Sequence, residues 1–375
     1  MSPLLGDRSA CGNSAWQMCI ARTAWLAAAL FVATCDSARA EIRSDERVVF
    51  FPTLARLSDD GQHWEAEIHG WIFEPETDSS VRRKTIAALQ AVARVDADSQ
   101  NSAVFQQRIR LFLVDNERAK VVVIRCGDLT QDLEPSGAEG HFRGKLLIPV
   151  AVAEKLATDG LLPFRAVTAA NDERKFAGSI HLIPPTGLSV ISDIDDTIKI
   201  TEVTDKRKTL DNTFFQPFRA VDGMPALYRR WGAAGARFHF VSNSPWQLYP
   251  PLAEFAQAER FPAGTFHLKT FRLQDGGLWD LFADPVATKI PAIERLLVAY
   301  PRRKFVLVGD SGERDPEVYG RIARAFPEQV RGIFIRDVTN EPADAPRYAE
   351  AFREVPSAMW QVFRDPSRLA LPADR

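Results

Sequence analysis

Residues 188–197 read LSVISDIDDT, a short apolar strand that leads directly into three carboxylates. Asp193, Asp195 and Asp196 lie so close together that they repel one another unless something offsets their charge. A hard divalent cation would do so, and Mg²⁺ commonly binds one or two carboxylates together with phosphate oxygens. Ligands also bind at the carboxyl ends of strands in open α/β sheets. An acidic turn or a helix N-cap is the alternative for this stretch taken alone.

Beyond residue 187 the chain alternates apolar strands with helices, which predicts an α/β sheet with helical crossovers and parallel strands. We expect Ser244 as the N-cap of the second helix, with Pro245 in its first turn. The expected strands are 188–191, 237–241, 304–308 and 332–335, and the expected helices are 225–234, 245–258, 289–300 and 316–325.

Groups that suit a phosphate or a metal follow the other strands of this region. Ser242 and Asn243 come directly after the second strand, and the third runs into GDSGERD at 309–315, which contains Asp310 and Asp315. Lys289 opens the helix before that third strand. Phosphoryl transfer needs positioning, charge neutralisation and a nucleophile in line, and this set of groups offers all three.

Residues 45–186 read mostly as short strands separated by turn signals, which favours a β-rich, sandwich-like domain. Pro184-Pro185-Thr186-Gly187 marks the expected domain boundary. We expect a hairpin from 109–114 and 120–125 with a five-residue loop, and a helix near 82–94. The other expected strands are 64–73, 142–149, 164–169 and 177–183.

Composition excludes several classes of protein. The chain has 375 residues and is 46% hydrophobic, enough for two domains with real cores and too much for a mainly disordered chain. A net charge of −2 excludes a polycationic nucleic-acid binder, so no nucleic-acid partner is expected. The histidines show no metal spacing, and we expect structural roles for His69, His239 and His267, which lie in strand-like segments.

The first forty residues read as a signal peptide. Ala24–Ala33 is an apolar run too short to span a bilayer comfortably, and Ala38-Arg39-Ala40 fits a signal-peptidase site. The expectation is an exported protein, periplasmic or secreted, that starts at Glu41. A buried helix, a membrane anchor, a lipoprotein through Cys35 and a start codon further downstream are the alternatives. Cleavage leaves only Cys126, which excludes an intramolecular disulfide.

The order of these motifs resembles the haloacid dehalogenase superfamily of phosphotransferases. SDIDDTIK at 192–199, SNSPW at 242–246 and GDSGERDPEVY at 309–319 resemble the catalytic domain of the actin-patch-associated phosphatidate phosphatases of fungi and their bacterial relatives. The resemblance covers about residues 187–340. It implies a Rossmann-like α/β catalytic domain at 187–345, between the β-rich accessory domain at 41–186 and a C-terminal extension at 346–375.

The resemblance also implies roles for individual residues. Asp193 would be the nucleophile that forms a phosphoaspartyl intermediate. Asp195 would protonate the leaving alkoxide and then activate water, and Thr197 would brace the turn. Ser242 would hydrogen-bond the phosphoryl group. Lys289 would bridge the nucleophile and the phosphate. Lys269 is the alternative for this role, but the position of Lys269 relative to the third strand fits the family motif less well.

The metal implied is Mg²⁺. The side chain of Asp193, the backbone carbonyl of Asp195 and the carboxylate of Asp310 would bind it directly, and Asp315 would bind it directly or through water. An anionic nucleophile attacks an anionic phosphate only if such cations offset the repulsion.

Other residues remain open between two roles. Asp196 would support Lys199 or the metal shell, or lie at the surface. Glu313 and Arg314 would be substrate contacts or part of a solvated loop, and the solvated loop is favoured. The basic and aromatic insert at 205–219 would meet a lipid headgroup, but a solvated loop over core aromatics is favoured. Two further apolar clusters are either a lipid entrance or core; they are Trp246 with Tyr249, and Leu278–Phe282.

These inferences predict a Mg²⁺-dependent phosphatidate phosphatase that releases diacylglycerol and phosphate. Its partners would be a phospholipid substrate and, through peripheral contact, a membrane. The first alternative is a phosphatase of the same mechanism that acts on a soluble phosphomonoester. The second is an exported binding or scaffold protein with a vestigial site.

Overall fold

The computed structural model describes residues 41–75, 103–271 and 284–372. The described residues from Ile42 onward form one compact unit. The expected signal peptide, the expected helix near 82–94 and the apolar cluster Leu278–Phe282 lie outside the described residues. Within the described part of the chain, no helix combines the length and the hydrophobicity needed to cross a bilayer.

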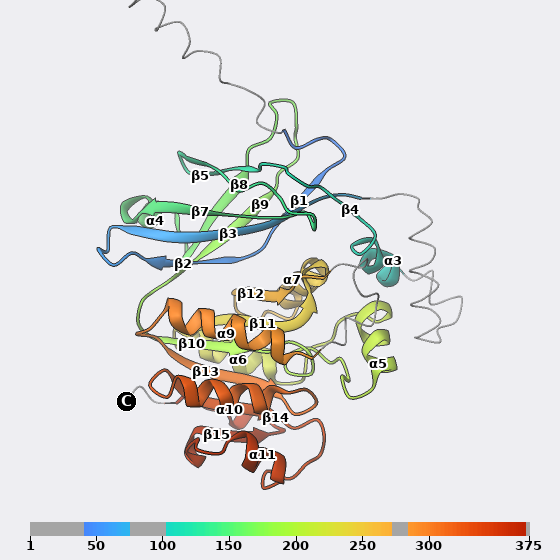
Figure 1. Ribbon diagram of the computed structural model, residues 1–375, viewed down its shortest axis with the longest axis vertical. Coiled ribbons are helices and arrows are strands. Elements are labelled where there is room, and N and C mark those ends of the chain that lie inside the picture. The colour runs from blue at the N-terminus through green and yellow to red at the C-terminus, as the bar shows by residue number, and fades with distance from the viewer. Residues whose placement is uncertain (1–40, 76–102, 272–283, 373–375) are drawn as a thin grey trace, which may run out of the picture. The chain divides into compact units, whose positions relative to one another are not determined.

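The region before residue 184 is rich in strands, as predicted (Figure 1). Its nine described strands join in one hydrogen-bonded sheet, so the expected sandwich of two sheets is not confirmed. The long strand β3 pairs with four others, β1, β2, β4 and β7. The strands are β1 (Arg47–Phe50), β2 (Thr53–Leu57), β3 (His63–Glu74), β4 (Asp115–Asn116), β5 (Val123–Cys126), β6 (Leu129–Asp132), β7 (His141–Pro149), β8 (Leu161–Ala166) and β9 (Ala177–Ile183), and the helices are α3 (Ala103–Arg110) and α4 (Val150–Leu156).

The hairpin expected from 109–114 and 120–125 is wrong. Residues 103–110 form helix α3, and between this helix and β5 only Asp115–Asn116 are a strand, β4, which pairs with β3. The reason is a helical spacing: Phe105 and Ile109, four residues apart, are both fully buried on one face of α3. Short apolar runs do not distinguish a strand from a buried helix, and here tertiary packing favours the helix.

The second region contains a six-stranded sheet in which every neighbouring pair of strands is parallel, as expected. In order along the chain, the third, second, first, fourth, fifth and sixth strands lie side by side, the order of a doubly wound, Rossmann-like sheet. The last strand comes from the expected C-terminal extension. The strands are β10 (Leu188–Ser192), β11 (Arg237–Pro245), β12 (Gly264–Lys269), β13 (Lys304–Asp310), β14 (Val330–Arg336) and β15 (Trp360–Phe363).

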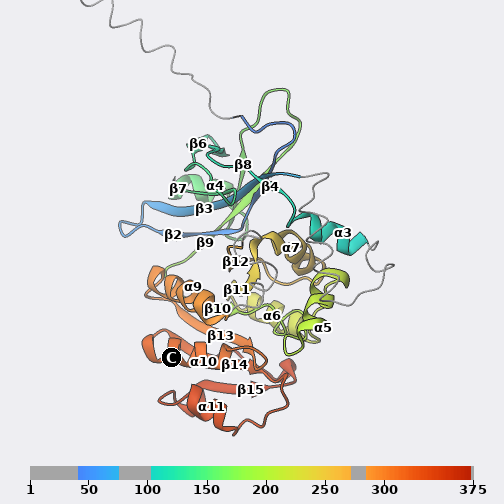
Figure 2. The ribbon, with the colours of Figure 1, turned by 45° about the vertical axis from the view of Figure 1, so that its right-hand side comes forward.

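Helices cover both faces of this sheet (Figures 1 and 2). Strand side chains point alternately to the two faces, so Val190 and Val306 pack in one core with α6 and α7. Their neighbours Ile191 and Leu307 pack in the other core with α9, α10 and α11. The helices are α5 (Lys206–Leu210), α6 (Met224–Ala233), α7 (Tyr249–Ala258), α9 (Val286–Ala299), α10 (Asp315–Ala325) and α11 (Pro346–Ala351), and a π-helical turn spans Asp211–Phe215.

The expected helix start at Ser244 is wrong. Strand β11 continues through Pro245, and α7 begins at Tyr249 after a 3₁₀ turn at Trp246–Leu248. Ser244 does not cap a helix because its hydroxyl donates to a carboxylate, Oδ2 of Asp195, at 2.9 Å.

Of the three histidines expected to be structural, His69 and His239 are buried and His267 is partly buried. His239 lies between the hydroxyls of Ser189 and Thr265, at 3.1 and 2.8 Å. His69 Nε2 lies 2.9 Å from Nδ1 of His141. Burial lowers the pKa of His141 to about 4 and holds the pKa of His69 well below its usual value. These rings are therefore neutral core groups at neutral pH.

Candidate active site

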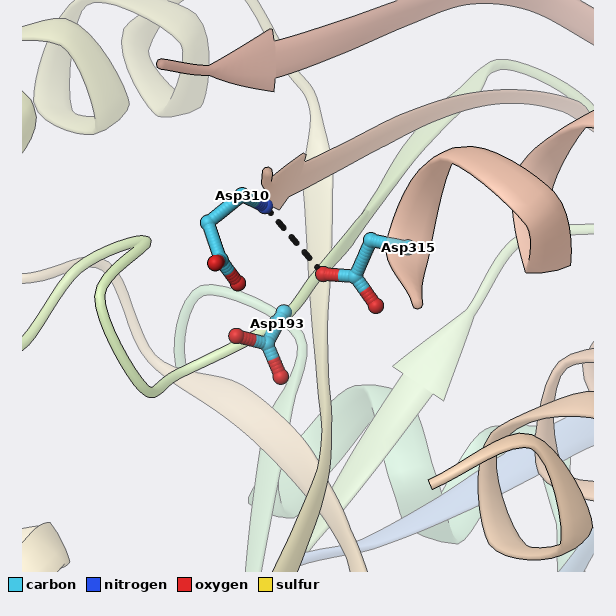
Figure 3. Close-up of side chains that lie close together, drawn as sticks. All are labelled: Asp193, Asp310 and Asp315. Carbon is cyan, nitrogen blue, oxygen red and sulfur yellow. Dashed lines mark hydrogen bonds between the residues drawn. The ribbon is translucent and has the colours of Figure 1, made fainter. Parts of the chain in front are cut away.

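Three carboxylates meet at the carboxyl ends of β10 and β13, the point where the strand order reverses. Asp193 follows β10, Asp310 ends β13, and Asp315 is the first residue of α10. One oxygen from each lies within 4.8 Å of the other two, and all three side chains are fully buried (Figure 3). The structure thus brings together three of the four predicted metal ligands through their side chains.

Backbone hydrogen bonds hold these acids in place. The N–H of Asp193 donates to the carbonyl of Val308 at 2.9 Å, which extends the β10–β13 pairing by one residue. The N–H of Asp310 donates to Oδ2 of Asp315 at 3.2 Å (Figure 3). Oδ1 of Asp310 accepts the N–H groups of Gly312 and Glu313, at 2.6 and 3.2 Å. The loop is therefore folded around the carboxylates that it carries.

Lys289, from α9, lies among the acids. Its Nζ is 2.9 Å from Oδ1 of Asp193 and 2.5 Å from Oδ1 of Asp315, and its side chain is almost fully buried. The rival Lys269 ends the edge strand β12. The structure thus places the preferred lysine against the predicted nucleophile.

Glu313 also belongs to this cluster, so the expectation of a solvated loop is wrong for this residue. Its Oε2 accepts a hydrogen bond from Nζ of Lys289 at 2.9 Å, and its side chain is 21% exposed. The available signal was its place in GDSGERD, where it is a third acid between Gly309 and Pro316. Its neighbour Arg314 is 54% exposed, as expected of a solvated side chain.

The cluster has an excess of negative charge, four carboxylates around one ammonium. Burial, reinforced by the neighbouring acids, raises the pKa values of Asp193 and Asp310 well above the usual range of a carboxyl group. Burial alone would lower the pKa of Lys289, but the surrounding carboxylates outweigh it and raise that pKa. A further cation among these carboxylates would offset the excess negative charge.

The donors present fit a divalent cation. Asp310 Oδ2 is buried and accepts no hydrogen bond, and buried Asp193 Oδ1 has its ion pair with Lys289 but no hydrogen bond of regular geometry. Buried polar atoms without a partner are uncommon and costly in proteins. Carboxylate oxygens are the ligands that Mg²⁺ prefers, and a cation between these oxygens would satisfy both.

Asp195 lies beside this cluster with partners of its own. Oδ1 forms an ion pair with Lys199 at 2.8 Å, and Oδ2 accepts the hydroxyls of Ser242 and Ser244, at 3.1 and 2.9 Å. Burial would raise the pKa of Asp195, but Lys199 and the hydroxyl donors outweigh it and lower the pKa to about 2. Asp195 is thus a carboxylate in this arrangement, with Ser242 beside it.

Two residues shape the turn after β10. Thr197 donates to Oδ2 of Asp193 at 3.2 Å, which fits its expected bracing role. Asp196 is buried, so the expected surface role is wrong. Its backbone has a φ of +54°, in the left-handed region. Its carboxylate accepts the N–H groups of Thr201, Glu202 and Val203 at 2.6–2.9 Å. Asp196 therefore fixes the chain that leaves the site.

A cavity of about 190 Å³ opens beside Asp195 and Glu313. Its lining combines polar residues, among them Thr201, Asn243 and Ser244, with apolar ones. The insert between β10 and β11 supplies much of the wall through α5 and the π-helical turn. Wall residues from this insert and from β11 onward are Val203, Lys206, Thr209, Leu210, Thr213, Phe214, Pro245, Leu248 and Pro285.

The aromatic residues of the insert and of the turn after β11 are mainly core. Phe214, Phe215 and Trp246 are buried, and Trp246 packs on Phe51 with ring centroids 4.1 Å apart. Phe214 also reaches the cavity wall, so the insert is more than a solvated loop.

Comparison with known proteins identifies residues 188–337 as a match to the family model for the catalytic domain of phosphatidate phosphatase APP1. Phosphatidate phosphatase APP1 of Saccharomyces cerevisiae is 39% identical over 175 residues, which cover 45% of this chain and 29% of the relative. An uncharacterized protein of Schizosaccharomyces pombe is 32% identical over 212 residues, 55% of this chain and 34% of the relative. The chain thus spans about a third of these relatives' length.

Among solved structures, that of a carbohydrate esterase covers 77% of this chain and 87% of its own at 12% identity, with a TM-score of 0.21. That score is too low to inform the fold. The family match and the similarity to a curated phosphatidate phosphatase support a phosphatase, and hence a hydrolase, whose catalytic segment is residues 188–337.

Proposed function

We propose that this protein is a Mg²⁺-dependent phosphatidate phosphatase of haloacid dehalogenase type, which releases diacylglycerol and phosphate. The observation that carries the proposal is the contact of Lys289 with Asp193 inside the cluster that Asp310 and Asp315 complete. The match of residues 188–337 to a phosphatidate phosphatase catalytic domain supports the substrate class.

In this mechanism Asp193 is the nucleophile. One of its carboxylate oxygens forms a bond to phosphorus while the bond from phosphorus to the alkoxide of the leaving group breaks. Asp193, Asp310 and Asp315 would hold Mg²⁺, with the backbone carbonyl of Asp195 as the expected fourth ligand; the ion supplies charge that offsets repulsion between nucleophile and phosphate. Lys289 contributes a second positive charge at Asp193.

Asp195 handles the protons. It takes up a proton as the anionic phosphate binds, because the added negative charge disfavours its carboxylate form. It gives this proton to the departing alkoxide and then takes one from the water that attacks the phosphoaspartyl group, which regenerates Asp193 and frees phosphate. Its position on the cavity wall, with Ser242 and Ser244 on one oxygen, supports this role. Ser242 would hydrogen-bond the phosphoryl oxygens.

The cavity limits which part of a lipid is enclosed. Its volume of about 190 Å³ is below the 300–1,000 Å³ common for pockets that bury drug-sized ligands. A glycerol backbone with its first acyl carbons would lie against the apolar wall of Leu210, Phe214 and Leu248, while the acyl chains stay outside, in a membrane or micelle. A soluble phosphomonoester with a small leaving group is the second candidate, favoured by the same volume.

We also propose export, supported by the apolar run Ala24–Ala33 and the Ala38-Arg39-Ala40 sequence. Cell fractionation with N-terminal sequencing tests it: a mature chain that starts at Glu41 outside the cytoplasm supports export, and an intact cytoplasmic chain contradicts it.

The test of function is phosphate release from dispersed phosphatidate and from p-nitrophenyl phosphate, with Mg²⁺ or EDTA. Asp193→Asn is compared with Asp344→Asn, a change at an exposed loop residue. Release from phosphatidate that needs Mg²⁺ and Asp193 supports the proposal. Release from the small ester alone moves the substrate to the soluble class. No release from either by folded, Mg²⁺-loaded protein contradicts the enzyme and favours a binding protein with a vestigial site.

A further inference from the structure

Helix α3 contacts the insert between β10 and β11, whose residues line the cavity. This helix belongs to the strand-rich region, which precedes the family match at residues 188–337. Both views show α3 beside α5 (Figures 1 and 2). Arg108, on the last turn of α3, is 5% exposed. Its Nη1 donates to the carbonyls of Thr213 and Gln216, at 2.6 and 2.7 Å. One guanidinium therefore holds both carbonyls at the end of the π-helical turn Asp211–Phe215.

Ring contacts extend this attachment. Phe105 of α3 stacks on Phe215 with centroids 4.6 Å apart and planes 4° from parallel. Phe112, just after α3, lies 5.4 Å from the ring of Phe214. The Arg108 guanidinium also lies 3.7 Å from the ring centroid of Phe218, within the range of a cation–π interaction. Three aromatic side chains of the insert thus contact three residues at or near α3.

The same turn faces the cavity. Thr213, whose carbonyl Arg108 holds, and Phe214, which Phe112 contacts, both line it. Lys199, at the start of the insert, approaches the Phe218 ring at 4.8 Å and pairs with Asp195 at 2.8 Å. A shift of the turn would therefore move the apolar wall relative to Asp195.

We propose that α3 sets the width of the cavity, with Arg108 as a positioning residue, so that the strand-rich region determines selectivity for apolar leaving groups. The inference rests on the proposed function, because it takes the cavity to hold the leaving group. It gives the N-terminal region a part in substrate selection without any contact with the reacting atoms.

Arg324 offers a matched control. Its Nη1 also donates to two carbonyls of another segment, those of Ala351 and Arg353, both at 2.9 Å. This pair lies in the α10–α11 packing, away from the insert. Arg108→Ala and Arg324→Ala therefore remove the same kind of contact, and only the first lies behind the cavity wall.

The first measurement is kcat and KM for dioctanoyl phosphatidate and for glycerol 3-phosphate. We expect Arg108→Ala to lower kcat/KM for dioctanoyl phosphatidate about tenfold relative to kcat/KM for glycerol 3-phosphate. The change should come mainly from a higher KM for the lipid. The affinity for Mg²⁺ alone, from calorimetry, should stay within about twofold because the Asp193 cluster is untouched. Arg324→Ala should change neither. An unchanged ratio in Arg108→Ala would overturn the inference.

Hydrogen exchange of the amides at 206–216 gives a readout that needs no activity. Arg108→Ala should raise exchange there while leaving β10 and β13 protected, and Arg324→Ala should not. Faster exchange with no hydrolysis by the wild type would refute the proposed function but keep the link between α3 and the insert; unchanged exchange refutes the link itself. If Arg108→Ala does not fold, Phe105→Leu, which removes the ring stacking on Phe215, takes its place with the same expected outcomes.

Discussion

Nζ of Lys289 lies 2.9 Å from Oδ1 of Asp193 and 2.5 Å from Oδ1 of Asp315, so one buried ammonium separates two buried carboxylates. These groups come from α9, from the end of β10 and from the start of α10. Removal of one partner from such a group leaves the others buried without compensation, which costs more than the ion pair itself contributes.

Lys289→Met should therefore reduce both activity and stability. We expect phosphate release to fall at least about 100-fold, because the charge at the nucleophile is lost. The free energy of unfolding at pH 7 without metal should fall by about 3–5 kcal/mol. Steady-state kinetics and urea unfolding measure the two effects, with Lys304→Met, at the start of β13, as the control. Activity within about threefold of wild type would contradict the role of Lys289.

Mg²⁺ should stabilise the folded protein through the carboxylate cluster. At 100 times the dissociation constant, bound cation adds about 2.7 kcal/mol to the free energy of unfolding. A thermal melt should then rise by roughly 5 °C with Mg²⁺ and return to the starting value with EDTA. Asp310→Asn should remove this response. A response that persists in the variant would place the cation elsewhere.

Arg347 should matter for metal affinity although it lies in α11. Its guanidinium donates to the carbonyls of Ser311 and Glu313, and to Glu317 at 3.1 Å, so it clamps the loop that carries Asp310. Groups that orient metal ligands typically contribute 10–100-fold in affinity. We expect Arg347→Ala to weaken Mg²⁺ binding about tenfold in calorimetry and Arg347→Lys to weaken it less. Arg324→Ala serves as the control, and equal affinities in all four proteins would argue against the clamp.

Acid should destabilise the protein through its buried histidines. The pKa of His141 is about 4 in the folded state against about 6.5 for an unperturbed histidine, so the unfolded state binds more protons between these values. The contribution of neutral His141 to the free energy of unfolding is complete above pH 6.5. It is lost as the pH falls towards 4, by up to about 3 kcal/mol. Urea unfolding at pH 4.5, 5.5 and 7.5 should show a smaller loss in His141→Gln than in wild type.

The difference between the two proteins reports on the His69–His141 pair, since the buried acids contribute to both. His63→Gln, at the partly exposed start of β3, is the control. If His141→Gln loses as much stability as wild type between pH 7.5 and 4.5, His141 does not control the acid response.

The sheet and the acids of the site could be predicted because their signals are local. Leu188–Ser192 is an apolar strand followed at once by acids, and the same holds at Lys304–Asp310. The carboxyl ends of neighbouring parallel strands lie at one edge, so their acids had to meet. The partner of each acid was less predictable: Glu313 joined Lys289 because α9 passes that loop, which no local pattern records.

The parts that were missed depend on contacts between distant segments. The last two residues of α3 read as the start of a strand, because the buried face of this helix is completed by Phe215, far along the chain. The buried role of Asp196 follows from three amides of a loop whose path only the folded chain defines. Tertiary packing decides such positions, and local preference does not.

The cluster of Asp193, Asp310 and Asp315 is complete only in the folded chain. Its oxygens come within reach of one another only after β13 has paired with β10. In the described part of the chain these two strands are separated by β11, β12 and helices α5, α6, α7 and α9. A partly folded chain without that pairing has no complete set of ligands, so a divalent cation stabilises only the native state. Added cation should therefore slow unfolding and leave early steps of refolding unchanged. The time at which the refolding chain first binds the cation would then report when the central sheet forms.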